Sequence, residues 1–322
     1  MLKFSNKKIF RLVGIIILII ILSKVDFQKI TAYFSNLNIM FFAVINLLIL
    51  PALFIKSSRW RYLLHLQGIN YSANDSFFSY LGGICAGIVT PGRIGETVKA
   101  IYLKQEKNIS LSEGLASVFI DRFFDFYILV LLGSIGFFHF LNIKNVRYDV
   151  LVFLILFLFL FPFLLFNKAF TERTGKIIYK SMISGLDQNF FEGQFKSFFS
   201  AVKKIILQRV YLPFVLTILA YLLYFWQCYL LAHLASIDIS YMTVMFFVSV
   251  ANLVSIIPIT ILGIGTREAS LIYLFSMHGL NAEGALVYSF LLFVSFYLIS
   301  GLLGFVGWFV KGKNIKAVNK NG

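Results

Sequence analysis

The chain has 322 residues, of which 59% are hydrophobic and 13% are charged, whereas soluble domains carry about 25% charged residues. Such a chain cannot bury its apolar surface in one aqueous core, so the composition predicts an integral membrane protein and argues against a soluble enzyme. The 29 basic residues outnumber the 14 acidic ones and give a net charge of +15. Because the basic residues lie between apolar runs, membrane orientation explains this excess better than nucleic-acid binding.

Apolar stretches long enough to cross a bilayer recur along the chain, and a spanning helix needs about 20 mostly apolar residues. A basic cluster precedes the first stretch, as in a signal peptide, but no small-residue cleavage site follows, so we expect an uncleaved transmembrane helix. Two further apolar segments, 77–103 and 243–278, are interrupted by glycine and proline. The uninterrupted candidate spans are 9–23, 39–57, 114–138, 149–167, 211–235 and 284–310.

The loops between these segments predict the orientation of the chain. The N-terminal tail and the tail 311–322 carry basic residues without acidic ones, and the loop 168–209 is strongly basic. Cytoplasmic loops carry the excess of Lys and Arg. We therefore expect a multi-pass protein of the cell membrane with both termini and this loop in the cytoplasm, which requires an even number of crossings.

The two interrupted segments keep that parity if each enters the membrane and returns on the same side. Basic residues flank 77–103, which predicts entry from the cytoplasm, whereas the flanks of 243–278 are poor in Lys and Arg, which predicts entry from outside. Opposed re-entrant segments recur in transporters. The alternative is that both segments cross fully. The expected fold is an all-α polytopic bundle with one transmembrane domain, 1–310.

Within the loop 168–209, apolar residues recur at helical spacing. Phe191, Phe195, Phe198, Val202 and Ile205 lie on one face of a helix over 187–208, and basic residues lie between them. This pattern predicts an amphipathic helix in the cytoplasmic interface, where an anionic phospholipid surface attracts it. We expect anchoring to be its role, and gating or the gathering of lipid headgroups is the alternative.

The first interrupted segment contains the clearest candidate site. Pro91, Gly92 and Gly95 break the helix, and Arg93 and Glu96 lie beside the break. Broken backbone at membrane depth must be buried in protein or line a wet cavity. The two charged side chains therefore either bind an ion or a lipid headgroup, or pair with each other to fix the break.

The second interrupted segment repeats these ingredients. Pro258, Gly263 and Gly265 break it, and Arg267 and Glu268 follow. The parallel predicts one site shared between the two breaks.

The third span carries Asp121, Arg122 and Asp125. The two carboxylates are four residues apart and share a face, and charges within a span normally face the bundle interior. Either Arg122 pairs with Asp125, or the carboxylates receive Arg93 or Arg267 from a broken segment. No nucleophile or metal accompanies them, so we do not expect catalysis.

Arg59 and Arg61 flank Trp60 at the end of the second span. They are either residues of the positive-inside pattern with an interfacial aromatic, or arginines that grip a lipid phosphate. The scattered histidines and two cysteines have no metal-ligand spacing, and no nucleotide-binding motif is present. We therefore expect no metal and no cofactor.

Together these residues resemble a known family. The order is Arg-Trp-x-x-Leu-Leu at 59–64, Thr-Pro-Gly-Arg-Ile-Gly-Glu at 90–96, Asp-Arg-x-x-Asp at 121–125 and Pro-x-x-x-x-Gly-x-Gly-x-x-Glu at 258–268. It resembles the lysylphosphatidylglycerol synthase transmembrane-domain family, which includes the flippase half of the multiple peptide resistance factor. In full-length synthases a soluble domain transfers the aminoacyl group and the membrane half moves the product lipid. We expect the transferase half to be absent here.

The resemblance implies a flippase-like protein that translocates an anionic or aminoacylated phospholipid, or a polyprenyl-phosphate-linked lipid, and is not an enzyme. The site would comprise Arg59, Arg93, Glu96, Asp121, Arg122, Asp125, Arg267 and Glu268, with the arginines holding an anionic headgroup. Two alternatives remain. One is a membrane-embedded lipid transferase, and the other is a non-transporting partner of a lipid or glycan synthase. A homo-oligomer is also compatible with the sequence.

Overall fold

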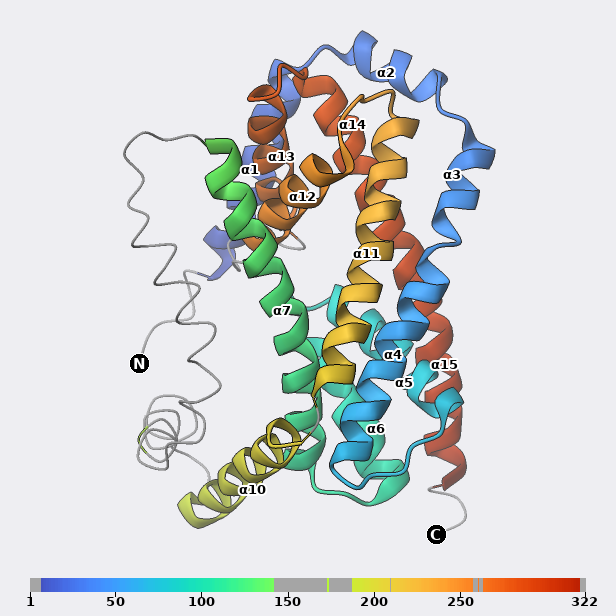
Figure 1. Ribbon diagram of the computed structural model, residues 1–322, viewed down its shortest axis with the longest axis vertical. Helices are drawn as coiled ribbons and strands as arrows, with labels where there is room; N and C mark the ends of the chain where they lie inside the picture. The colour runs from blue at the N-terminus through green and yellow to red at the C-terminus, as the bar shows by residue number, and fades with distance from the viewer. Residues whose placement is uncertain are drawn as a thin grey trace.

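The computed structural model describes residues 7–141, 173, 187–208, 210–256, 260 and 263–318, and these residues form helices and no strands (Figure 1). The predicted span 149–167 and the predicted break residue Pro258 lie outside the described residues. The α-helices are α1 (Lys7–Lys24), α2 (Phe27–Ser35), α3 (Ile39–Asn46), α4 (Ile49–Leu66), α5 (Ala73–Ile88), α6 (Val98–Lys107), α7 (Leu111–Leu141), α10 (Gln188–Ile206), α11 (Tyr211–Leu234), α12 (Tyr241–Ile256), α13 (Thr266–Ser276), α14 (Ala282–Phe293) and α15 (Ser300–Val318). A short 3-10 segment, η2 (Pro91–Thr97), precedes α6, and a π-helical segment, η4 (Val294–Ile299), joins α14 to α15.

The all-α membrane fold predicted from the sequence is confirmed. Among the described residues, three helices are long and apolar enough to cross a membrane, Ile39–Leu66, Tyr211–Leu234 and Ala282–Gly312. They coincide with predicted spans, and α1 and α7 also lie where spans were predicted.

The first interrupted segment is a helical hairpin. Helix α5 ends at Ile88, the chain turns through η2, and α6 returns alongside α5. The two ends of the hairpin meet, because the Tyr71 hydroxyl donates to Glu106 Oε2 over 2.6 Å. This is the hairpin form expected of a re-entrant segment; its placement in a membrane stays a prediction.

The second interrupted segment is also a hairpin, formed by α12 and α13. The ring of Phe247 in α12 lies 5.7 Å from that of Phe275 in α13. The end of this hairpin packs on α14, which contacts α2 at the top of Figure 1, whereas the ends of the first hairpin contact the C-terminal part of α15, at the bottom. The two hairpins therefore open toward opposite ends of the bundle, and their entry into the membrane from opposite sides stays a prediction.

Each hairpin packs against helices that are distant from it in the sequence. Among helices distant in sequence, the most extensive packing joins α5 to α15, α7 to α12, and α4 to α11. Each hairpin thus packs on the long helix that follows the other hairpin. Small residues permit this approach, since a Cβ atom on Gly307 would lie 2.4 Å from Leu81 Cβ.

The predicted amphipathic helix is α10, which begins after the N-cap Asp187. Val202 and Ile205 are buried against α4 and α7, and the Phe198 ring lies 5.7 Å from Phe119 in α7. Its apolar face is therefore docked on the bundle over its second half, and the membrane-anchoring role stays a prediction.

The predicted basic tail begins inside α15. Lys311 is fully buried, and its Nζ atom lies 2.8 Å from Asp75 Oδ1, 2.9 Å from Glu106 Oε1 and 3.2 Å from the Tyr71 hydroxyl. The sequence predicts Lys311 only as part of the basic cytoplasmic tail. In the structure its ion pairs connect α15 to the start of α5 and the end of α6.

Candidate functional site

Arg59 lies at the centre of a buried group of charged side chains contributed by α4, α6 and α7. It is fully buried, and its Nη2 atom lies 2.7 Å from Asp121 Oδ1 while its Nη1 atom lies 2.9 Å from Asp125 Oδ1. Nη1 also donates to Thr217 Oγ1 in α11. Arg59 therefore uses its fork to hold both carboxylates of α7, rather than to mark a membrane surface. Arg61 donates to the carbonyl oxygen of Tyr71 and serves the fold.

The first hairpin adds Lys99 and Glu96 to this group. The Nζ atom of Lys99 lies 3.0 Å from Asp121 Oδ2 and 3.6 Å from Glu96 Oε2. It also lies over the rings of Tyr80, at 4.3 Å, and Trp60, at 5.2 Å. A fully buried ammonium is thus compensated by two carboxylates and two aromatic faces.

Glycines of α5 make room for these two side chains. A Cβ atom on Gly83 would lie 2.8 Å from Cγ of Lys99, and one on Gly87 would lie 2.7 Å from Cγ of Glu96. The returning arm of the hairpin can therefore carry long charged side chains across the face of α5 toward α7.

Arg122 completes the ion pairs. Its Nη1 lies 3.0 Å from Glu96 Oε1, and its Nη2 lies 2.7 Å from Asp125 Oδ2 and from the Tyr80 hydroxyl. Its buried Nε atom has no hydrogen-bond partner among the described residues. On the other side, Lys56 Nζ lies 3.6 Å from Asp125 Oδ1. We call the seven residues the central charge cluster: Lys56, Arg59, Glu96, Lys99, Asp121, Arg122 and Asp125.

The break in the first hairpin holds Arg93 at the edge of this cluster. Gly92 and Arg93 both have left-handed backbone conformations, with φ of 61° and 58°, which costs energy for an arginine. The Thr90 hydroxyl accepts a hydrogen bond from Gly95 N over 2.7 Å and fixes the turn. Arg93 approaches Glu96 only to 4.0 Å.

The second break forms a separate and electrically neutral group. Glu268 Oε2 accepts from Gly265 N over 2.6 Å and caps α13, and its Oε1 lies 2.5 Å from Arg267 Nη2. Ser289 of α14 donates to Glu268 Oε1 and accepts from Arg267 Nε. Gly263 and Gly265, with φ of 72° and 87°, form the turn before the cap, as predicted.

Tyr297 joins the two breaks. The guanidinium carbon of Arg93 lies 5.8 Å from the centroid of its ring, and that of Arg267 lies 5.4 Å from the same centroid. Tyr297 belongs to the π-helical segment η4, and such segments occur frequently at functional sites. The arginines of both broken segments therefore meet at one side chain near the middle of the bundle.

Of the two pairings predicted from the sequence, the local ion pair of Arg122 with Asp125 is present. The predicted ion pairs of the α7 carboxylates with Arg93 or Arg267 are replaced by others. Arg59 pairs with both Asp121 and Asp125, and Lys99 pairs with Asp121. Lys56, Lys99 and Tyr297 were not identified from the sequence. The signal was helical spacing, since Lys56 precedes Arg59 by three residues and Lys99 follows Glu96 by three.

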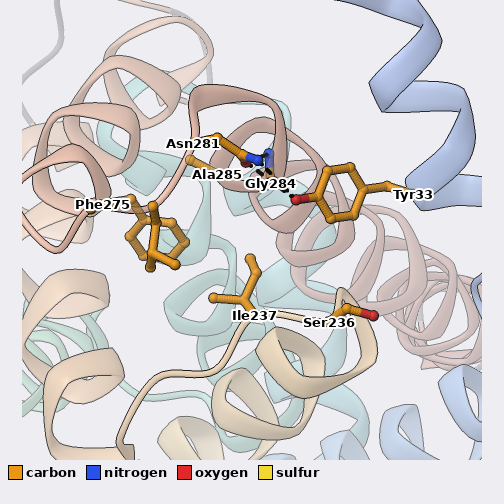
Figure 2. A pocket seen from close by; sticks show the side chains of 9 residues that line it. Tyr33, Ser236, Ile237, Phe275, Asn281, Gly284 and Ala285 are labelled. Carbon is orange, nitrogen blue, oxygen red and sulfur yellow. Dashed lines mark hydrogen bonds between the residues drawn. The ribbon is translucent and has the colours of Figure 1, made fainter.

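No group of three or more His, Cys, Asp or Glu side chains suited to a metal occurs in the part of the chain that the structure describes. A pocket of about 170 Å³ lies at the base of the second hairpin, where Asn281 Nδ2 donates to the Tyr33 hydroxyl (Figure 2). None of its lining residues belongs to the central charge cluster or to the second break.

The amino-acid sequence is similar to those of known membrane proteins. Three archaeal membrane proteins, described as UPF0104 membrane proteins, are similar over most of their length. MJ1595 of Methanocaldococcus jannaschii is 22% identical over 97% of both chains, and MJ1078 of the same organism is 23% identical over 72% of this chain and 97% of its own. A protein of Methanothermobacter thermautotrophicus is 26% identical over 82% of this chain and 81% of its own. No solved structure matches the chain.

The sequence model described as the lysylphosphatidylglycerol synthase TM region matches residues 9–304. That match covers nearly all of the described helices, including both hairpins and the central charge cluster. The chain therefore belongs to the lysylphosphatidylglycerol synthase transmembrane-region family.

Proposed function

We propose that the protein translocates a lipid across the cell membrane, with the headgroup passing between the two hairpins. The observation that carries the proposal is the meeting of Arg93 and Arg267, one from each break, at the ring of Tyr297. Opposed broken segments that meet near the middle of a bundle are the arrangement in which transporters bind substrate. The substrate is an anionic or aminoacylated phospholipid, or a polyprenyl-phosphate-linked lipid.

The buried charges of α4, α6 and α7 support this proposal, because charged groups at membrane depth are costly and usually serve substrate or ion pathways. The proposal assigns no bond-making step to the chain. It places both termini in the cytoplasm, so that the first hairpin enters from that side. A lipid or glycan synthase as partner, or a second copy of the chain, is compatible with it.

The test is lipid flipping by purified protein in vesicles, measured as the fraction of fluorescent headgroup-labelled lipid that becomes accessible to an impermeant quencher. Tyr297→Leu removes the ring shared by the two arginines and should slow flipping about tenfold, which corresponds to about 1.4 kcal/mol. The control is Tyr273→Leu, which removes a ring that is exposed on α13. Flipping by Tyr297→Leu at the rate of the control, or no flipping by the unmodified protein over a broad panel of lipids, would contradict the proposal.

A further inference from the structure

The side chains that the central charge cluster and the adjoining Arg93 present outward are all basic. The side chains of Arg93, Arg122 and Lys56 are 47%, 27% and 20% exposed. The carboxylates of Glu96, Asp121 and Asp125 are at most 9% exposed, because Arg59 and Lys99 cover them from inside the bundle. A molecule that approaches the cluster therefore meets cations first.

The charge balance of the described residues points the same way. The cluster together with Arg93 contains five basic and three acidic side chains, which leaves two positive charges without a carboxylate. Arg93 is the least compensated, since its nearest carboxylate, that of Glu96, lies 4.0 Å away and is already held by Arg122 at 3.0 Å. Uncompensated charge in a membrane protein costs several kcal/mol.

The second break does not correct this balance. Arg267 and Glu268 neutralise each other, both bond to Ser289, and Glu268 also accepts from Gly265 N. The positive surplus therefore lies on the side of the first hairpin, around Arg93.

We propose that the headgroup bound at this site carries a phosphate with a net negative charge, and that the site rejects cationic, aminoacylated headgroups. This inference rests on the proposed function and narrows its substrate class. Arg93 and Arg122 would donate to the phosphate oxygens, and Lys56 would add a third positive charge. An aminoacylated headgroup would instead bring its own cation to a surface that already repels one.

Binding is measured separately from transport. Tail-labelled fluorescent phosphatidic acid, phosphatidylethanolamine and lysyl-phosphatidylglycerol are titrated into the protein in nanodiscs of phosphatidylcholine. We expect phosphatidic acid to bind at least about tenfold more tightly than the other two, with an advantage that falls as salt concentration rises. Equal affinity for the three lipids, or tighter binding of lysyl-phosphatidylglycerol, would overturn the inference.

Variants locate the binding. Arg93→Asn removes the charge but keeps a residue that tolerates the left-handed conformation, and it should weaken phosphatidic acid binding about tenfold. Arg93→Glu should move the preference toward lysyl-phosphatidylglycerol. The matched control Lys104→Gln removes one positive charge from an exposed position on α6 and should leave binding unchanged. Equal weakening by the Arg93 and Lys104 variants would reduce the effect to general surface charge and overturn the site.

Two further measurements distinguish failure of the headgroup assignment from failure of the proposed transport. Inorganic phosphate is titrated as a competitor, and displacement of the lipid at micromolar concentration would show the free ion to be the ligand and overturn the lipid assignment. Flipping is then measured with the same lipids. Selective binding of phosphatidic acid without flipping of any lipid would contradict the proposed transport and support the headgroup assignment. Flipping that favours lysyl-phosphatidylglycerol would support transport and overturn the headgroup assignment.

Discussion

The two hairpins carry the same residue types at their breaks and use them differently. In the first hairpin, Arg93 and Glu96 point to different partners, because Glu96 is held by Arg122 and Lys99 while Arg93 stays half-exposed. In the second hairpin, Arg267 and Glu268 bind each other at the start of α13. The first break therefore leaves the positive charge of Arg93 available to a ligand. At the second break, Glu268 neutralises Arg267 and caps α13, so no charge is left over.

The difference follows from where each pair lies relative to the turn. In the first break, Arg93 has a left-handed backbone and lies outside any regular helical turn, and its guanidinium reaches Glu96 only to 4.0 Å. In the second, the left-handed residues are Gly263 and Gly265, so Arg267 and Glu268 fall within the first helical turn. A carboxylate at that position satisfies backbone N–H groups. A similar composition thus produces a binding surface in one hairpin and a cap in the other.

The largest expected loss of stability tests whether the ion pairs of the central charge cluster also stabilise the fold. Asp121→Asn leaves Arg59 and Lys99 buried without their shared carboxylate, so we expect a loss of about 3–5 kcal/mol of stability. Thermal unfolding in detergent measures it. Asp238→Asn, at an exposed position, is the matched control. A melting temperature equal to that of the control would show that water solvates the cluster, so that its cations do not need the carboxylate of Asp121.

The next effect concerns the turn that sets Arg93 apart. A Cβ atom on Gly95 would lie 2.1 Å from the carbonyl oxygen of Ala86, so Gly95→Ala must distort the hairpin at a cost of about 1–3 kcal/mol. The control is Gly193→Ala in α10, where the added methyl meets no atom within 4 Å and should stabilise the helix by about 0.5–1 kcal/mol. Thermal unfolding that ranks the two variants in the reverse order would refute this description of the turn.

The third prediction tests the second break as a cap. Glu268→Gln weakens the contacts to Gly265 N and Arg267, and we expect it to cost about 1–2 kcal/mol. This is smaller than the effect at Asp121, because Arg267 keeps its bond to Ser289 and its aromatic contacts. The preference for phosphatidic acid over phosphatidylethanolamine should not fall, because the substitution leaves Arg267 without its carboxylate at the ring that it shares with Arg93. A fall in that preference would show that Glu268 itself helps to form the headgroup site.

The smallest stability effect is expected at Arg93 itself. Arg93→Gly relieves the left-handed strain but adds entropy to the unfolded chain, so the net change should be below about 1 kcal/mol. Lipid binding should nevertheless fall, as for Arg93→Asn. A marked loss of thermal stability would mean that Arg93 holds the fold, and the contrast between the two hairpins would then disappear.

Local sequence patterns were sufficient to predict several of these features. The breaks at Gly92, Gly263 and Gly265 and the extent of α10 depend on residues within a few positions of each other, and so does the pair of Arg122 with Asp125, which was one of two predicted alternatives. Residues so close in the chain have their relative positions fixed by helix geometry and turn chemistry. The partners of Arg59 could not be predicted in this way, because Asp121 lies 62 residues further along the chain.

The amino-acid sequence by itself determined that this protein belongs in a membrane, where its two interrupted segments break, and that several charged residues lie within or beside apolar segments, because apolar length, glycine, proline and charge act locally. Only the tertiary structure decided which charges compensate each other. Pairing in a low-dielectric interior requires atoms about 3–4 Å apart, and that distance depends on which helices become neighbours. The packing of α7 against α4 and α6 buries the carboxylates beside Arg59 and Lys99, and it leaves the side chain of Arg93 half-exposed.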